Sequence, residues 1–193
     1  MSELDFLELI INRRFLQQGD DALTMIEPTD DSHKEQRVSI SNRIKSISGM
    51  KLYCFNKEET SGENRFPFFN QNNNDPFKAP KELNSFCDYI LLFQYNQVPY
   101  IFLLELKRGT KEGAEVQLNA SREFVMFLLR TADRIKVCND VDFDQSIFKI
   151  RRIIIKEQNS NKRITKPKNI SPDELDNCLT CYCMNEFRPT MYL

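Results

Sequence analysis

The chain has 193 residues, of which 40% are hydrophobic and 28% are charged, as is usual for a globular protein with one buried core. Its five glycines argue against a glycine-rich nucleotide-binding fold. No apolar run approaches the roughly 20 residues that a membrane-spanning helix needs. The acidic N-terminus lacks the basic segment that is typical of a secretory signal. We therefore expect a cytoplasmic protein that does not enter a membrane.

The net charge of −1 conceals an uneven distribution along the chain. Residues 1–35 hold nine acidic side chains against three basic ones, whereas residues 149–168 hold eight basic side chains against one acidic one. A polyanionic partner would be attracted to the second stretch. A solvated basic hairpin without any ligand explains the same charges, so both interpretations stay open at this point.

The first half of the chain predicts helices, one strand and a long polar loop. Closely spaced apolar residues predict an N-terminal helix over Leu4–Leu16, and a second helix is expected over Ser32–Ser48. Met50–Phe55 is expected to form a short strand. Residues 56–85 are rich in Asn, Gln, Pro, Lys and Glu, which favours a long loop over a linker between two domains.

The second half shows a clearer pattern. Cys87–Gln94 and Tyr100–Lys107 are expected to be strands joined by a short turn. Their apolar runs are continuous rather than alternating, which predicts that both faces are covered. Apolar residues at three- and four-residue spacing predict a helix over Ala114–Ile135. Phe148–Lys156 is expected to form a further strand, and the basic turn 158–163 to lead into another short one.

These elements predict one α/β domain that spans residues 1–193. Residues 1–55 would supply N-terminal helices and a first strand, and 56–85 the long polar loop. Residues 86–156 would form the core that carries the chemistry. The basic turn and a C-terminal segment would occupy residues 157–193.

Charged residues stand where the two central strands begin and end. Asp88 precedes the first apolar run, while Glu105 and Lys107 follow the second. Because side chains alternate along a strand, Glu105 and Lys107 should share one face while Leu104 and Leu106 fill the other. A hairpin would bring Asp88 close to both charged residues. Isolated charges are costly to bury, so their convergence at an apolar sheet indicates a function.

This grouping suits phosphodiester chemistry. Two neighbouring carboxylates supply the oxygen ligands that Mg²⁺ or Mn²⁺ prefers, and the backbone carbonyl of Leu106 would be an additional ligand. Such a metal polarises a phosphate oxygen and lowers the pKa of a bound water. Lys107 could position or deprotonate the attacking water, or stabilise the charged phosphorane. The alternative is that Asp88 caps a turn while Glu105 and Lys107 form a solvent-facing pair.

The residues from Cys87 to Gln117 resemble the core of the PD-(D/E)XK nucleases, the restriction-endonuclease-like superfamily. That family has an Asp at the start of one hairpin strand, E-x-K at the end of the next, and often a Gln on the following helix. The resemblance covers residues 86–122 and extends to the strand at 148–156 in topology only. Cys87 stands where the family often has Pro, a difference that should not affect the chemistry.

The resemblance implies a restriction-endonuclease-like mixed central sheet flanked by helices. It also implies that Asp88 and Glu105 are metal ligands, Lys107 the catalytic lysine and Gln117 an auxiliary catalytic residue. Many members carry a further Glu on an early helix, for which Glu35 is the first candidate. The other candidate is Glu8, and an ordinary exposed glutamate explains either residue as well.

Two further features of the sequence suggest related metal sites. His33, the single histidine, could match the histidine ligand on an early helix of viral cap-snatching endonucleases, although an exposed residue at a helix start explains it better. Three clustered cysteines could hold zinc, or resemble the iron–sulfur ligands of CRISPR-associated RecB-type nucleases. Their spacing is too tight for such a site, so unligated thiols are favoured for Cys178, Cys181 and Cys183.

We therefore expect a Mg²⁺- or Mn²⁺-dependent nuclease that acts on DNA rather than RNA, in restriction, repair or anti-phage defence. The substrate backbone would be contacted by the stretch 149–168, including the neighbours Arg151 and Arg152, and elsewhere by Arg108, Lys111 and Arg122. A homodimer or a partner subunit is left open. The alternatives are a cap-snatching-like RNA endonuclease and a non-catalytic nucleic-acid- or protein-binding module on the same fold.

Overall fold

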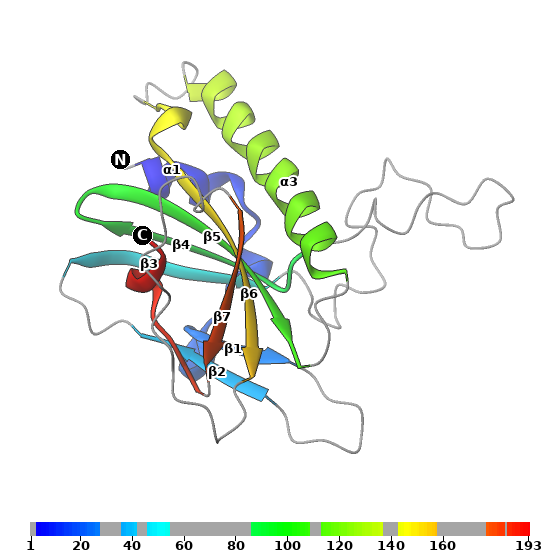
Figure 1. The fold of residues 1–193 in the computed structure, drawn as a ribbon. Helices are drawn as coiled ribbons and strands as arrows, with labels where there is room; N and C mark the ends of the chain where they lie inside the picture. Colours follow the sequence, from blue (N-terminus) through cyan, green and yellow to red (C-terminus); the bar gives the residue numbers. More distant parts are fainter. Residues whose placement is uncertain are drawn as a thin grey trace, which may run out of the picture.

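The computed structural model describes residues 3–27, 36–41, 46–54, 86–108, 113–136, 143–157, 177–183 and 185–193. These residues form two β-sheets and two α-helices stacked in layers, which confirms the predicted α/β class (Figure 1). Among these residues, no helix combines the length and the apolar character needed to cross a membrane. The predicted polar loop 56–85 and the basic turn 158–163 lie outside the described residues.

The larger sheet has five strands in the order β3-β4-β5-β6-β7. The strand bounds are Ile47–Cys54 for β3, Tyr89–Tyr95 for β4, Val98–Lys107 for β5, Lys149–Glu157 for β6 and Cys178–Cys183 for β7. β4 is antiparallel to both of its neighbours, β3 and β5, whereas β5, β6 and β7 run parallel. Parallel neighbours need a crossover, and the helix α3 (Ala114–Ile135) lies between β5 and β6 in the chain.

A two-residue turn sets the register of the β4–β5 hairpin. Asn96 and Gln97 both have left-handed backbone angles, with φ of 48° and 67°, as in the type I′ turns that suit twisted hairpins. The pairing then runs from Tyr95 opposite Val98 to Tyr89 opposite Leu104. Asp88 and Glu105 therefore come next on either side, at the far end of the hairpin.

Two helices cover one face of the larger sheet. α1 (Glu3–Ile10) and α3 pack their apolar side chains against β4, β5 and β6. Leu7 of α1 and Leu118 of α3 meet strand residues such as Ile90 and Ile101 in this core. Both helices lie on this face, so the expected flanking of the sheet by helices holds on one side only.

The second face of the larger sheet is covered by a small sheet in the order β1-β2-β8. The bounds are Thr24–Glu27 for β1, Gln36–Ile40 for β2 and Glu186–Phe187 for β8, and a 3-10 helix at Pro189–Tyr192 follows. Its side chains, among them Met25, Val38 and Phe187, contact a row of aromatic rings that includes Phe93 and Phe102. Both faces of β4 and β5 are therefore covered, as their continuous apolar runs predicted.

One hydroxyl ties the small sheet to the large one. The backbone N–H of Ile26 donates to the Tyr89 hydroxyl at 2.8 Å, and that hydroxyl donates to the Ile26 carbonyl at 2.9 Å. Burial raises the pKa of Tyr89 well above its usual value, so the phenol keeps its proton. The hydroxyl thus satisfies both backbone groups of Ile26, where β1 is an edge strand.

The structure corrects the predicted N-terminal half. α1 ends at Ile10, and a short 3-10 helix over Arg13–Phe15 follows, so the helix predicted to reach Leu16 was too long. The helix predicted over Ser32–Ser48 is wrong in its described part, because residues 36–40 form β2 and Ile47 begins β3. In β2 buried and exposed residues alternate, which is the two-residue period of a strand with one covered face; the buried ones are Val38 and Ile40.

The second half agrees more closely with the prediction. The helix Ala114–Ile135 is confirmed at both ends, and the three central strands are confirmed with ends shifted by one or two residues. β3 begins three residues before the predicted strand at Met50. The next described strand after β6 is β7, which runs parallel to β6, so these two strands do not form the basic hairpin considered above.

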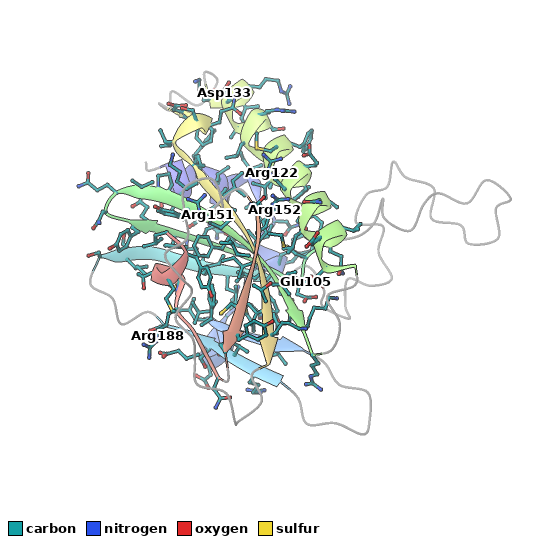
Figure 2. All side chains as sticks on the ribbon, viewed as in Figure 1. Glu105, Arg122, Asp133, Arg151, Arg152 and Arg188 are labelled. Carbon is teal, nitrogen blue, oxygen red and sulfur yellow. The ribbon has the colours of Figure 1, made fainter. Side chains whose placement is uncertain are left out.

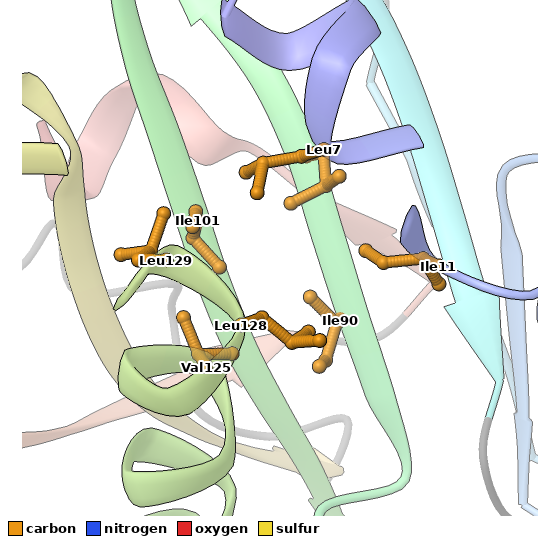
Figure 3. A pocket seen from close by; sticks show the side chains of 8 residues that line it. Leu7, Ile11, Ile90, Ile101, Val125, Leu128 and Leu129 are labelled. Carbon is orange, nitrogen blue, oxygen red and sulfur yellow. The ribbon is translucent and has the colours of Figure 1, made fainter. Parts of the chain in front are cut away.

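A small cavity lies between α1, α3 and the larger sheet (Figure 3). Aliphatic side chains from all three elements line it: Leu7, Ile11, Ile90, Leu92, Ile101, Val125, Leu128 and Leu129. An apolar cavity of this kind offers a water molecule no hydrogen-bond partner and is expected to stay dry. It marks the place where the two helices meet the sheet.

Replacing Leu7 with Ala should lower the free energy of unfolding by about 2–5 kcal/mol, because it removes buried contacts and enlarges an existing cavity. Phe127→Ala is the matched control, since that side chain is 63% exposed on α3. Its effect should stay within about 0.5 kcal/mol. Urea denaturation followed by circular dichroism measures both. Equal stability of the two variants would contradict the packing of α1 described above.

Candidate active site

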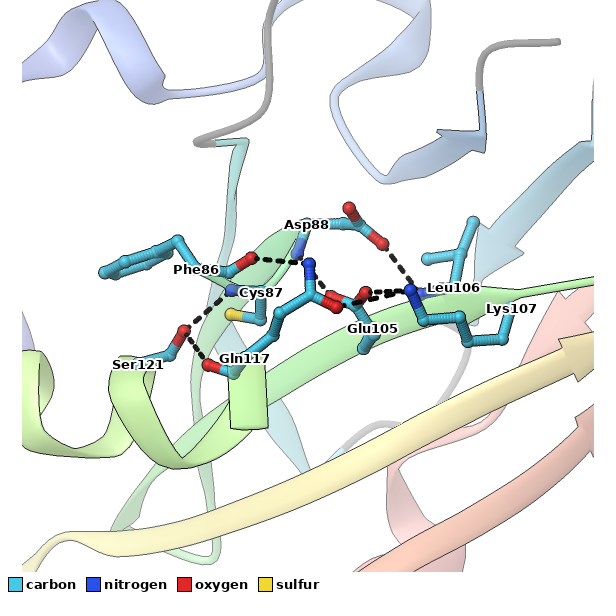
Figure 4. A network of polar contacts seen from close by, with 8 residues as sticks. All are labelled: Phe86, Cys87, Asp88, Glu105, Leu106, Lys107, Gln117 and Ser121. Carbon is cyan, nitrogen blue, oxygen red and sulfur yellow. Dashed lines mark hydrogen bonds and ion pairs between the residues drawn. The ribbon is translucent and has the colours of Figure 1, made fainter. Parts of the chain in front are cut away.

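Two carboxylates are held at the open end of the β4–β5 hairpin by the backbone of the opposite strand (Figure 4). The backbone N–H of Asp88 donates to Glu105 Oε2 at 3.1 Å. The N–H of Leu106 donates to Asp88 Oδ2 at 2.8 Å. Each carboxylate thus accepts an amide hydrogen bond where the sheet ladder ends, and the two side chains are fixed beside each other.

Lys107 lies against the same group. Its ammonium is 2.8 Å from Glu105 Oε1 and donates to Gln117 Oε1 at 3.2 Å. Glu105 is only 1% exposed, whereas the Lys107 side chain is 25% exposed. The predicted arrangement of Asp88 beside Glu105 and Lys107 is therefore present, and Gln117 joins it from α3.

A second set of hydrogen bonds fastens α3 to the start of β4. Gln117 Nε2 donates to the Phe86 carbonyl at 3.4 Å. The N–H of Cys87 donates to Ser121 Oγ at 2.7 Å, and this hydroxyl donates to the Gln117 carbonyl at 2.8 Å. Because Gln117 and Ser121 are four residues apart, they lie on one side of the helix. The contacts orient Gln117 toward Lys107.

Ser121 was missed by the sequence analysis. It is fully buried on the face of α3 that also buries Leu118 and Val125. A polar residue within an otherwise apolar helical stripe was the signal that could have identified it. Buried hydroxyls are nearly always hydrogen-bonded, so this position implied a partner.

The environment of Glu105 opposes its negative charge. Burial first, and then the neighbouring charge of Asp88, raise the pKa of Glu105 to about 8, although Lys107 acts in the opposite direction. Two close carboxylates in a buried place repel each other, and a bound cation relieves that repulsion. The site therefore has the electrostatic character of a cation-binding position.

The donor set fits a hard divalent cation. Asp88 and Glu105 contribute carboxylates, and within the described residues no cluster of three or more His, Cys, Asp or Glu side chains is found. Mg²⁺ suits such a site, because it retains several waters and is often held by one or two carboxylates together with substrate phosphates. In a strand the N–H and C=O of one residue point to the same side. Since the N–H of Leu106 points to Asp88, its carbonyl is directed to the same side.

Of the other predicted metal ligands, only Glu8 lies among the described residues, and it is not part of this group. Glu8 forms an ion pair with Lys51 of β3. Lys51 is opposite Leu92 of β4, which is four residues away from Asp88 along the chain. Glu35 and His33 lie outside the described residues.

The three clustered cysteines lie on β7 but not on one face. Cys181 and Cys183 belong to the core beneath the small sheet, whereas Cys178 packs against the core beneath α1 and α3. The alternation of side chains along a strand thus separates one thiol from the other two. A common ligand for all three would require a different backbone conformation.

Of the predicted phosphate-contacting residues, Arg122 lies on α3, and Arg151 and Arg152 lie on β6 (Figure 2). The two β6 residues project to opposite faces of the sheet. Arg151 is 8% exposed and opposite Phe102 in the register, on the face covered by the small sheet. Arg152 is on the α3 face and donates to Asn119 of α3. Arg151 therefore does not share a surface with the carboxylates, contrary to its expected role. Arg122 is half exposed, and Lys111 lies outside the described residues.

With a chelator present, Glu105 should make stability fall as pH rises. Its folded pKa is raised, so its contribution is complete below about pH 4.5 and is lost as pH rises to about 8. The free energy of unfolding of wild type minus that of Glu105→Gln should therefore decrease by about 1.4 kcal/mol per pH unit within this window. Urea titrations between pH 4.5 and 9 measure the difference. Glu115→Gln, an exposed position on α3, is the control and should show no such slope. A difference that grows with pH would mean that the pairing with Lys107 dominates.

No known protein family, curated protein or solved structure matches this chain. The case for a function therefore rests on the geometry at the end of the β4–β5 hairpin.

Proposed function

We propose that this protein is a Mg²⁺- or Mn²⁺-dependent nuclease that hydrolyses phosphodiester bonds. The observation that carries the proposal is the interlocked pair Asp88 and Glu105, with Lys107 in contact with Glu105. A buried carboxylate beside a half-buried carboxylate and an ammonium costs free energy unless these charges bind something. A cation and a phosphate group together would satisfy all three charges.

The fold supports a restriction-endonuclease-like arrangement. An antiparallel hairpin carries Asp88 on one strand and Glu105-Leu106-Lys107 on the next, and a helix then crosses to a parallel strand. This agrees in order and direction with the PD-(D/E)XK core that the motif resembles. The small sheet on the second face departs from a sheet flanked by helices on both sides, and it lies away from the carboxylates.

The metal would be held by the carboxylates of Asp88 and Glu105 and by the carbonyl of Leu106. When bound, it would polarise a phosphate oxygen and lower the pKa of a bound water. The chain keeps these ligands in place through the two amide hydrogen bonds described above. Neither carboxylate needs to reorganise when the substrate arrives, which is the basis of electrostatic preorganisation.

Lys107 would act on the reacting phosphate. An ammonium has three N–H donors, and two of them are directed to Glu105 Oε1 and Gln117 Oε1. The third can donate to a phosphate oxygen or hold the attacking water. Because Glu105 and Gln117 both contact the ammonium, they orient it. Gln117 therefore acts as the positioning residue for Lys107.

We expect DNA rather than RNA as the substrate, and restriction, repair or anti-phage defence as the setting, by analogy with the superfamily. Arg108, Lys111 and Arg122, together with the basic residues of the stretch 149–168 that follow β6, would contact the phosphate backbone independently of sequence. No observation favours the cap-snatching-like RNA endonuclease or the non-catalytic binding module. Both are outcomes of the experiment that follows.

A panel of single- and double-stranded DNA and RNA should be cleaved with Mg²⁺ or Mn²⁺ but not with Ca²⁺, whose longer and more variable ligand distances fit the site less well. Gel analysis of labelled substrates measures this. Asp88→Asn, tested in parallel, should abolish cleavage. Cleavage of RNA alone would identify an RNA endonuclease. Binding without any cleavage would leave the binding module, and cleavage in EDTA would contradict a metal site.

Lys107→Ala should reduce the cleavage rate by about 100-fold or more, the usual loss of a group that acts only in the transition state. Binding, measured separately in Ca²⁺ by fluorescence anisotropy, should change little because Lys107 is one charge among several. Lys149→Ala, an exposed lysine at the start of β6, is the control and should leave both quantities near wild type. A loss of affinity in proportion to activity would refute the catalytic role of Lys107.

A further inference from the structure

The register of the parallel strands places three side chains in a row that starts at the catalytic group. Lys107 of β5 is opposite Lys156 of β6, and Lys156 is opposite Tyr182 of β7. Paired positions in a sheet project to the same face, and neighbouring strands are about 4.8 Å apart. The row Lys107–Lys156–Tyr182 therefore runs about 10 Å across the sheet, from the carboxylates to the β7 edge.

This row lies on the α3 face but beyond the part that the helix covers. Two residues earlier along the strands, Ile154 is 1% exposed in the core beneath α1 and α3. In the row itself the side chains are more exposed: Lys156 is half-buried and Tyr182 is 50% exposed. Tyr182 is one of three exposed large hydrophobic residues among those described. A phenol ring is thus presented to solvent beside Lys156.

The paired side chains of Lys107 and Lys156 are both positively charged, so a bound anion between them would be stabilising. Like charges at directly paired positions of neighbouring strands destabilise a sheet. Glu105 balances Lys107, as their 2.8 Å contact shows, but it points away from β6 toward Asp88 and Lys107. A phosphate lying over Lys156 would offset this repulsion and would be next to the reacting centre. Nucleic-acid strands carry such phosphates together with bases that stack on aromatic rings.

We propose that the row Lys107–Lys156–Tyr182 is the track for a single-stranded segment of the substrate, with a phosphate on Lys156 and an unpaired base stacked on Tyr182. This inference rests on the proposed nuclease function and adds the substrate class. A base inside a duplex keeps its faces covered by its neighbours and cannot stack on the ring. The preference is therefore for single-stranded or frayed nucleic acid.

The test measures binding of a fluorescent single-stranded oligothymidylate in Ca²⁺ by anisotropy, so that cleavage plays no part. Tyr182→Ala should weaken binding by about 5- to 100-fold, the effect of one base–aromatic stack. Tyr182→Phe keeps the ring and should bind like wild type. Lys156→Ala should weaken binding and reduce the log–log salt slope by about 0.7, as expected for one phosphate contact on a single strand.

Matched controls separate the track from general charge. Lys149→Ala removes one exposed lysine from the same strand, but Lys149 is opposite Tyr100, on the face covered by the small sheet. It should change neither affinity nor salt slope. A strand with abasic sites should bind wild type and Tyr182→Ala equally. As a check that needs no variant, ultraviolet crosslinking of a 5-iodouracil strand should label the peptide that contains Tyr182.

Several outcomes would overturn the track. One is that Tyr182→Ala, with a melting temperature like that of wild type, binds single strands as tightly as wild type does. Another is that Tyr182→Phe loses as much affinity as Tyr182→Ala, or that Tyr182→Ala loses as much affinity for a blunt duplex as for a single strand. The last is that wild type does not bind single strands. The proposed function fails differently. If wild type binds single strands through Tyr182 but cleaves nothing with Mg²⁺ or Mn²⁺, the track stands and the nuclease does not.

Discussion

The candidate site depends on the exchange of hydrogen bonds between side-chain carboxylates and backbone amides where β4 and β5 end. Asp88 accepts from the N–H of Leu106, and Glu105 accepts from the N–H of Asp88. Hydrogen bonds of this kind are stronger than neutral ones when the carboxylate is ionised. They hold two carboxylates together although burial and mutual repulsion raise the pKa of Glu105. The protein thus maintains an electrostatically unfavourable position, which is the basis of the cation site proposed above.

The helix α3 makes this arrangement specific. Ser121 and Gln117 bond to the backbone just before Asp88, and Gln117 also reaches Lys107. A shift of the helix along the sheet would break these bonds and misplace the ammonium. The apolar contacts of Leu118 and Val125 with the sheet oppose such a shift. The same helix therefore packs against the core and orients Lys107.

The two faces of the larger sheet carry different kinds of side chain. The face beneath α1 and α3 carries the charged group and the row that leads to Tyr182, while the other face is a core of aromatic and aliphatic residues closed by the small sheet. Alternation along β6 and β7 enforces the division, because Arg151 and Arg152 cannot both project to the face that carries Glu105 and Lys107. The same alternation parts Cys178 from Cys181 and Cys183. Residues that are close together in a basic or cysteine-rich strand therefore need not lie on the same surface.

The sequence by itself determined the elements whose pattern is local. The helix Ala114–Ile135 follows from its apolar spacing, the central hairpin from two continuous apolar runs, and the meeting of Asp88 with Glu105 and Lys107 from strand alternation and hairpin closure. Only the tertiary structure decided the rest. Residues 36–40 form a strand because the large sheet offers a second apolar face to cover, and Ser121 and Tyr182 gain their positions from contacts or register between segments far apart in the chain. Local spacing does not encode which strand lies beside which, so it cannot show these relations.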